Sequence, residues 1–484
     1  MIIISVYSSR LLLKSLGVED FGIYNLVGSV IAVFQSFRMM FASSTQRFLN
    51  VEMGKNNHQA LQMVFSMSLI VNVGVAILFA VLSELIGIWF IENKINISPD
   101  KIVDAYYVLH FSVAAAVIGI VATSYDAVII ANERMNFYAY SSILEVVLKL
   151  LIILPLWFLP DGRLIWYSIL IFIVSFIIRF IKSAYCSSNF PESKFKYHWD
   201  KDYLKTMITF AGWQLFGNTA CAFSNNILNM MLNVFGGPVV NAARGISYQV
   251  NSLMQQFIIN ISIVINPYCM RSYGEDNLSS MFRMLFFSSK IYYIIEACII
   301  IPLFLLTKQI LYLWLGIVPE YTVIYVQLIL LWSIVKAFHP AIDTMFKAVG
   351  NLKIYQLTEG VILMLPLVFS YFTLKYNGNL IMPFVYIVLF ELLDLVAISY
   401  EAKYIASLDL KAFYDKVLFP SFLFTLLFGI ITVYAYFVIN NITVLIGFAI
   451  IIDLLFLTAS YCFLLSKEEK LSLLNIIQSK LKKS

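Results

Sequence analysis

The 484-residue sequence has little charge, because Asp, Glu, Lys and Arg together make up only 13% of it. A soluble domain of this size would carry about 25% charged residues. The hydrophobic fraction is 61% and the mean hydropathy is +0.85. These values exclude an ordinary soluble protein and predict apolar spans of about 20 residues joined by short polar links. The net charge of +5 is small, and its basic residues lie in links, so we expect no nucleic-acid partner.

The sequence also lacks the usual signs of an enzyme or a metal centre. Its four His are isolated, and its five Cys lie far apart with no CxxC pair, so we predict no metal site and no disulfide. There is no HExxH, GxSxG, GxGxxG or P-loop motif. Every link between apolar runs is short, which excludes an extramembrane catalytic domain. We therefore predict a protein that is not an enzyme and holds no cofactor.

Long hydrophobic runs are what the sequence does contain. Their number predicts an all-α integral membrane protein with about fourteen transmembrane helices. The first run, residues 1–13, is short for a span, which predicts a partial first helix or a start upstream of residue 1. A polar segment at 186–202 separates two halves. We predict an N-terminal lobe (1–190, six helices), a C-terminal lobe (191–410, six helices) and a final part (411–484) with two additional helices and a tail.

The pattern of residues 5–57 returns about 220 residues later, as expected for a duplicated module. Gly17 matches Gly237 and Asn57 matches Asn277, while Asp126 matches Asp343 at a slightly shorter spacing. Two copies of a six-helix module are a usual plan of secondary transporters, in which the substrate path lies between the pseudo-symmetric copies. Lys and Arg concentrate in alternate links and in the tail, which predicts that both termini are cytoplasmic.

Several spans carry polar side chains at helical spacing, and such stripes should face protein or water rather than lipid. Four such faces would enclose one central cavity. The alternative is direct helix–helix hydrogen bonding without a cavity. The residues that we expect to line the cavity are Asn25, Ser29, Gln214, Asn218, Asn225, Asn229, Tyr248, Asn251 and Gln255.

Charged residues inside the spans form a second group of candidates. Glu145 and Lys149 are i,i+4 neighbours and can form an ion pair that is either structural or functional. Glu391 and Asp394 lie close together on one helix, which favours proton binding, or else pairing with a basic residue of another helix. Lys336 lies near the end of a predicted span, so we expect its ammonium group to reach the membrane surface.

The string SSRLLLKSLGVEDFGIYNLVGSV resembles the entry signature of the polysaccharide-transporter branch of the multidrug/oligosaccharidyl-lipid/polysaccharide exporter superfamily. An SR pair ends the first helix, and the pattern LG-x-x-D-[FY]-G-x-Y-x-L opens the second. The matching residues here are Ser9, Arg10, Leu16, Gly17, Asp20, Phe21, Gly22, Tyr24 and Leu26. The resemblance implies a MATE-like fold with a cationic central cavity. It also implies a Wzx-type flippase of the bacterial inner membrane, which moves undecaprenyl-pyrophosphate-linked O-antigen or capsule units to the periplasmic leaflet.

The chemistry of that substrate assigns roles to the candidates. Guanidinium and ammonium groups suit pyrophosphate, so we predict that Arg10, Arg38, Arg244 and, more weakly, Lys149 bind it. The polar stripe residues would contact the glycan, and Glu145, Glu391 and Asp394 would couple transport to H⁺ or Na⁺. Membrane lipid, an O-antigen polymerase and a chain-length regulator are the implied partners. The alternatives are a multidrug/cation antiporter of the same fold, which would need an acidic cavity, and a membrane-embedded polysaccharide-processing enzyme.

Overall fold

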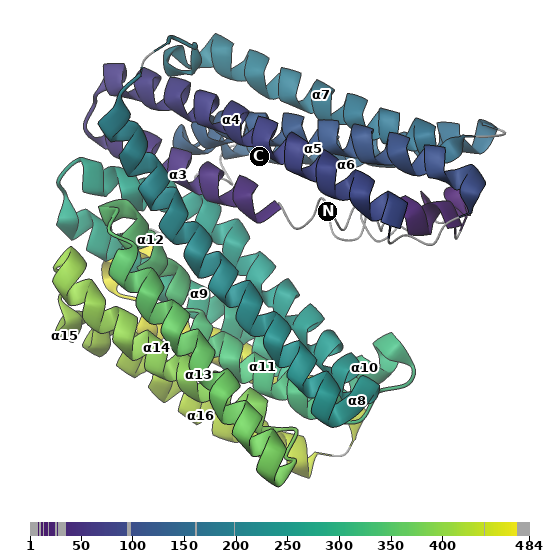
Figure 1. The fold of residues 1–484 in the computed structure, drawn as a ribbon. Helices are drawn as coiled ribbons and strands as arrows, with labels where there is room; N and C mark the ends of the chain where they lie inside the picture. The colour runs from purple at the N-terminus through teal and green to yellow at the C-terminus, as the bar shows by residue number, and fades with distance from the viewer. Residues whose placement is uncertain are drawn as a thin grey trace. The chain divides into compact units, whose positions relative to one another are not determined.

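The computed structural model describes residues 8, 11–12, 14–17, 19–24, 27, 35–93, 98–159, 162–197, 199–439 and 441–471, with the side chains of 35–40 excepted. The chain forms two compact units, Met1–Leu215 and Phe216–Ser484. The regular structure of the described residues is entirely helical, which confirms the predicted all-α class (Figure 1).

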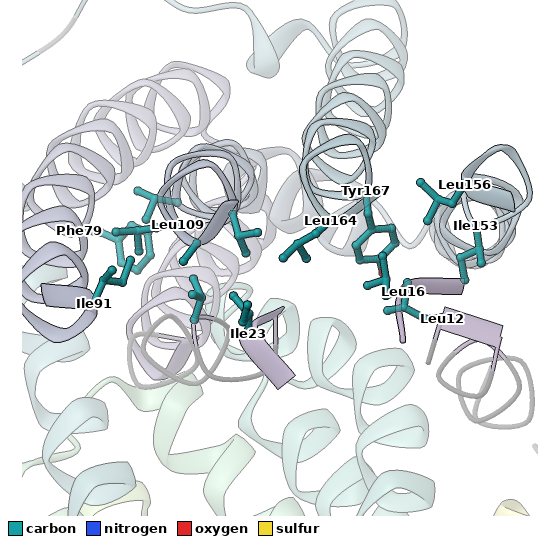
Figure 2. Packing of buried hydrophobic residues seen from close by; sticks show 14 of the residues in the cluster. Leu12, Leu16, Ile23, Phe79, Ile91, Leu109, Ile153, Leu156, Leu164 and Tyr167 are labelled. Atoms are coloured by element: carbon teal, nitrogen blue, oxygen red, sulfur yellow. The ribbon is translucent and has the colours of Figure 1, made fainter. Parts of the chain in front are cut away.

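In the described part of the N-terminal unit, α5 lies at the centre of a group of long helices. It packs against α3, α4, α6 and α7, and these helices run side by side in Figure 1. Apolar side chains from several of the helices and from the first described residues fill the space between them. Figure 2 shows Tyr167 of α7 against Leu12 and Leu16, with Ile153 and Leu156 nearby. The helices are α3 (Gln35–Gly54), α4 (His58–Asn93), α5 (Ile102–Ala131), α6 (Met135–Leu151) and α7 (Arg163–Asn189), with short η1 (Pro99–Lys101), η2 (Pro155–Phe158) and η3 (Pro191–Ser193) between them.

The C-terminal unit begins within α8 (Lys201–Gly274), which is two helices joined at a kink. Gly237 has φ +75° and ψ −173° there, and Pro238 follows it. α13 and α14 pack together, and α11 and α12 pack against α14. The last two long helices pack on α9. The remaining elements are α9 (Leu278–Leu305), α10 (Thr307–Leu315), α11 (Thr322–Lys336), α12 (His339–Val349), α13 (Lys353–Asn377), α14 (Met382–Ala406), α15 (Leu410–Phe413), η4 (Tyr414–Leu418), α16 (Phe419–Val438), α17 (Ile442–Ala459) and η5 (Ser460–Leu464).

The helices are of a length and composition that suit a bilayer. Within the described ranges, 11 helical segments are long and apolar enough to cross a membrane, counting the kinked α8 once. A span needs about 20 apolar residues, and each half of α8 is longer than that. The protein is therefore a multi-pass membrane protein. The total of fourteen spans is compatible with this result and stays a prediction.

The backbone repeats itself in the two units, as the internal sequence repeat predicts. Gly17 and Gly237 both have positive φ, +84° and +75°. The turn after α3 and the turn after α8 close with equivalent hydrogen bonds, from Asn57 N to Glu52 O (3.1 Å) and from Asn277 N to Ser272 O (3.0 Å). Each of these Asn side chains then accepts a bond from a backbone N–H three residues later. These shared capping bonds fix where α4 and α9 begin.

The two units divide inside α8, later in the chain than the polar link at 186–202. The predicted division at residues 190 and 410 stays a prediction. Paired Asp residues recur within the units: Asp126 lies 2.7 Å from the Lys182 ammonium, and Asp343 lies 2.6 Å from that of Lys347. The Asp126–Lys182 pair joins α5 to α7, whereas the Asp343–Lys347 pair lies within α12 at i,i+4 spacing.

Candidate functional site

The kink of α8 brings the two polar faces of that helix together around Arg244. Its Nη1 donates to Asn229 Oδ1 (3.1 Å) and its Nη2 donates to the backbone oxygen of Asn225 (2.8 Å). The guanidinium carbon lies 4.1 Å from the ring centroid of Tyr248, one turn further along the helix. Gly237 makes this fold-back possible, because φ near +75° is strained for residues with a Cβ. Four predicted site residues thus form one cluster.

Arg244 is 6% exposed, and the acceptors of its guanidinium among the described residues are neutral oxygens with no carboxylate among them. Its Nε is buried and has no hydrogen-bond partner there. A buried charge without a counter-ion is costly, so a cation in this position favours an anion nearby. The cluster consists of a positive fork, two Asn groups and an aromatic ring, which together suit a phosphate with attached sugars.

Other residues of the polar stripes lie on the same helix but form separate contacts. Gln214 is buried and donates from Nε2 to Ser43 Oγ (3.2 Å) within the N-terminal unit. Asn218 is exposed, whereas Asn251 and Gln255 are partly buried. The Oδ1 of Asn251 is buried without a hydrogen-bond partner in the described part of the chain, so it is open to a ligand.

Some predicted site residues fall where the structure gives no description. Arg10, Asn25 and Ser29 lie outside the described residues, and so does the side chain of Arg38. Their assignments to pyrophosphate and glycan stay predictions. Lys149 is described, and its ammonium lies 2.6 Å from Glu145 Oε1 with both side chains about one-third exposed or more. The predicted i,i+4 ion pair is present, so the Lys149 ammonium already has a carboxylate as its partner.

A second cluster lies in the C-terminal unit, where α11, α12, α13 and α14 converge. Glu391 Oε1 is 3.1 Å from Lys336 Nζ and 3.0 Å from His339 Nε2. The Lys336 ammonium, which we expected at the membrane surface, is paired with this buried carboxylate. His339 was not among the predicted site residues, because its partners Glu391 and Asp394 lie on another helix, α14. Its position three residues after Lys336 is the signal that could have indicated it.

Two cavities within the C-terminal unit are apolar and do not include Arg244. One of about 480 Å³ lies between α8 and α13 and is lined by side chains such as Phe216, Phe223 and Val361. The other, of about 70 Å³, lies where α16 and α17 pack on α9 and α11. Both suit hydrocarbon rather than a charged ligand, so neither competes with the Arg244 cluster for an anion.

Comparison with known sequences decides the family. A family described as "Polysaccharide biosynthesis protein" matches residues 2–272, more than half of the chain. The chain belongs to this family. The match covers nearly all of the N-terminal unit and of α8, including the Arg244 cluster. No curated protein was found to match the sequence.

Solved structures similar to this polysaccharide biosynthesis family member are transporters. A MATE point mutant superposes with a TM-score of 0.74 at 14% identity, covering 84% of this chain and 92% of that chain. An outward-facing multidrug resistance MATE transporter of the MOP superfamily has a TM-score of 0.71 at 13% identity, covering 84% and 91%. A MOP superfamily transporter from Pyrococcus furiosus has a TM-score of 0.70 at 14% identity, with the same coverage. At these identities the likeness shows the MATE-like fold, as predicted.

Proposed function

We propose that this protein carries undecaprenyl-pyrophosphate-linked oligosaccharides, the repeat units of O-antigen or capsule, across the bacterial inner membrane by alternating access. The observation that carries the proposal is the buried Arg244, which has no acidic partner among the described residues. The family of the chain and its transporter fold support the same direction. The protein then acts as a flippase and performs no covalent chemistry.

The physical task is to move two phosphates and a hydrated glycan past about 30 Å of hydrocarbon while the prenyl tail stays in lipid. Unpaired charges in that region are expensive. Arg244 offers a planar fork that matches phosphate oxygens. Its present acceptors, Asn229 Oδ1 and Asn225 O, are neutral. Charge-assisted bonds to phosphate are roughly twice as strong as bonds to neutral acceptors, so an incoming pyrophosphate would displace them.

The neighbours of Arg244 suit the sugar part of the substrate. Asn241 and Asn251 each have a buried Oδ1 without a hydrogen-bond partner in the described structure. Amide groups both donate and accept, as sugar hydroxyls do. Tyr248 presents a ring and a hydroxyl on the same stretch of α8. Once Arg244 turns to phosphate, Asn225 and Asn229 also become available to the glycan.

A multidrug/cation antiporter is the rival from the same fold. It would need carboxylates near the substrate path, whereas the cluster on α8 is basic and amidic. The similar transporter from Pyrococcus furiosus is described as having a binding pocket of reversed polarity. The fold is thus compatible with pockets of either charge, and the residues of this chain favour an anion. Under the proposal, an O-antigen polymerase and a chain-length regulator would receive the product in the periplasm.

Depletion of the protein in its own cells tests the proposal. Lipid-linked repeat units should then accumulate on the cytoplasmic leaflet, where an impermeant periplasmic lectin does not reach them. Wild-type protein and Arg283→Gln, a charge removal at an exposed position, should restore access. Arg244→Gln should not restore it, although the protein is made and inserted. Unchanged leaflet distribution after depletion would refute the proposal, and a sensitised response to cationic drugs instead would favour the antiporter.

A further inference from the structure

The charge cluster of the C-terminal unit has more acids than bases. Lys336 at the end of α11 contributes one positive charge. Glu359 of α13 and Glu391 and Asp394 of α14 contribute three carboxylates. Lys336 Nζ lies 3.1 Å from Glu391 Oε1 and 3.5 Å from Glu359 Oε1. One ammonium cannot neutralise three carboxylates, so the cluster holds excess negative charge inside a membrane-spanning bundle.

Glu391 is well supplied with partners. Its Oε2 accepts a hydrogen bond from Trp332 Nε1 (2.7 Å), and its Oε1 faces both Lys336 and His339 at 3.1 Å and 3.0 Å. The carboxylate form of Glu391 is therefore stabilised from two sides. Glu391 can therefore stay buried as a carboxylate, without binding a proton.

Asp394 has no such support. It is 2% exposed, and neither of its oxygens has a hydrogen-bond partner in the described structure. The imidazole of His339 lies beside it, with Nε2 3.5 Å from Asp394 Oδ2. An isolated carboxylate in an apolar environment is far less stable than its protonated form. Asp394 is thus the acid in this cluster that needs a cation when it is buried.

The tautomer of His339 follows from its neighbours. Lys336 Nζ lies 3.1 Å from His339 Nδ1. An ammonium can only donate, so Nδ1 accepts and the imidazole proton is on Nε2. That nitrogen lies 3.0 Å from Glu391 Oε1 and 3.5 Å from Asp394 Oδ2. It makes no hydrogen bond to another described residue, so a rotation of the ring decides which carboxylate accepts its N–H.

We propose that Asp394 is an exchangeable proton site and that His339 is its positioning residue, which turns from Glu391 to Asp394 when the proton leaves. One O–H bond forms on Asp394 when a proton arrives from water, and the same bond breaks when the proton departs to water. No other reactant is needed. The proton site itself does not depend on the transporter function proposed above. Only the role of this proton exchange in driving transport rests on that function.

A metal ion is the competing occupant, because one atom each of His339, Glu391 and Asp394 lie within 4.8 Å of one another. A metal would require a free lone pair on His339 Nε2, the nitrogen that carries the proton. It would also sit beside the Lys336 ammonium, which already contacts the shared Glu391 oxygen. A proton avoids both conflicts.

Other titratable groups around Asp394 belong to the helices that pack on α14. Tyr355 and Glu359 of α13, Lys336 of α11 and His339 of α12 lie within electrostatic reach of it, together with Glu391 on α14 itself. Asp343 of α12 is paired with Lys347. Cys221 of α8 lies within reach of Lys336, Glu359 and Glu391. In the described part of the chain, none of these supplies Asp394 with a hydrogen bond.

Difference infrared spectroscopy of the purified full-length protein, recorded across pH without substrate, tests the site. We expect a protonated-carboxyl C=O band that disappears as pH rises. Asp394→Asn should remove the Asp394 component of this signal, and His339→Gln should shift the frequency of that component and the pH at which it disappears. The matched control is Glu296→Gln on α9, another fully buried acid, which should remove only its own contribution and leave the Asp394 component in place.

The same spectra distinguish a proton from a metal. Replacing choline by Na⁺, or adding Zn²⁺, at fixed pH should leave the band unchanged. A protonated-carboxyl signal that Asp394→Asn leaves at full intensity, or an Asp394 component that Na⁺ or Zn²⁺ removes at a pH where protons do not, would overturn the proposal. Because no substrate is present, a titrating Asp394 in a protein that flips no lipid would refute the proposed function and leave this site standing.

Discussion

Lys336 Nζ and Glu391 Oε1 lie 3.1 Å apart, on two different helices of the C-terminal unit, with the carboxylate almost fully buried. The pair joins α11 to α14 in a part of the bundle that offers little water. Removing one partner of a buried ion pair leaves an uncompensated charge and costs about 3–5 kcal/mol. We therefore expect that removing either charge alone destabilises the fold.

Lys336→Met should therefore lower the thermal stability of the detergent-solubilised protein strongly, by about 3–5 kcal/mol. The double variant Lys336→Met with Glu391→Gln removes both charges and should recover much of that loss. Thermal unfolding followed by far-UV circular dichroism measures the difference. A double variant no more stable than Lys336→Met alone would show that the pair is not coupled as described.

The N-terminal unit allows a matched comparison of two ion pairs. Lys182 and Asp126 are both largely buried at 2.7 Å, whereas Lys149 and Glu145 are more exposed at 2.6 Å. Lys182→Met should cost several kcal/mol because Asp126 is left buried and unpaired. Lys149→Gln should cost at most about 1 kcal/mol, as exposed pairs do. Equal losses of unfolding temperature in the two variants would contradict this ranking.

The kink of α8 depends on a residue that tolerates positive φ. Gly237→Ala should destabilise the protein by about 1–2 kcal/mol, because a Cβ is strained at φ +75° although no neighbour blocks the space. Gly245→Ala on the same helix is the control: it also has open space around it and has no positive φ. There Ala should be neutral or stabilising by up to about 1 kcal/mol. Limited proteolysis and thermal unfolding compare the two, and equal effects would argue against the strain.

Tyr248 contributes a ring face to Arg244, and we expect transport to depend on that ring. Tyr248→Phe keeps the ring and should retain most of the activity. Tyr248→Leu should weaken the apparent affinity by the worth of a desolvated cation–π contact, about 1–2 kcal/mol or roughly five- to thirty-fold. Concentration-dependent flipping in proteoliposomes measures both variants. A Tyr248→Leu variant with wild-type affinity would exclude the ring from the binding site.

The local features of the fold could be predicted from the sequence, because they depend on neighbours along the chain. Hydrophobic runs marked the spans, and the repeat of Gly17 at Gly237 marked an equivalent backbone conformation. Helical spacing placed Asn225 and Asn229 on one face, whereas their contact with Arg244 depends on the kink at Gly237 and is seen only in the structure.

The second cluster could be predicted only in part: Glu391 and Asp394 stood out on one helix, but their partners come from three other helices. His339 looked isolated in the sequence, and Lys336 looked like a residue near a membrane surface. Only packing of α11, α12, α13 and α14 shows that both face Glu391 and Asp394. Sequence periodicity shows which residues share a face of a helix, but it does not show which helices pack together. The sequence therefore left two possibilities for Glu391: proton binding together with Asp394, or an ion pair with a basic residue of another helix.

The most direct test of the central claim is flipping by the purified protein in proteoliposomes. The substrate is a labelled undecaprenyl-pyrophosphate oligosaccharide, and an enzyme outside the vesicles reports how much of it is accessible. We predict that the wild-type protein and Arg283→Gln move the lipid between leaflets, that Arg244→Lys does so slowly, and that Arg244→Gln does not. Equal flipping by wild type and Arg244→Gln, or by wild-type vesicles and vesicles without protein, would contradict an arginine-centred carrier of anionic lipids.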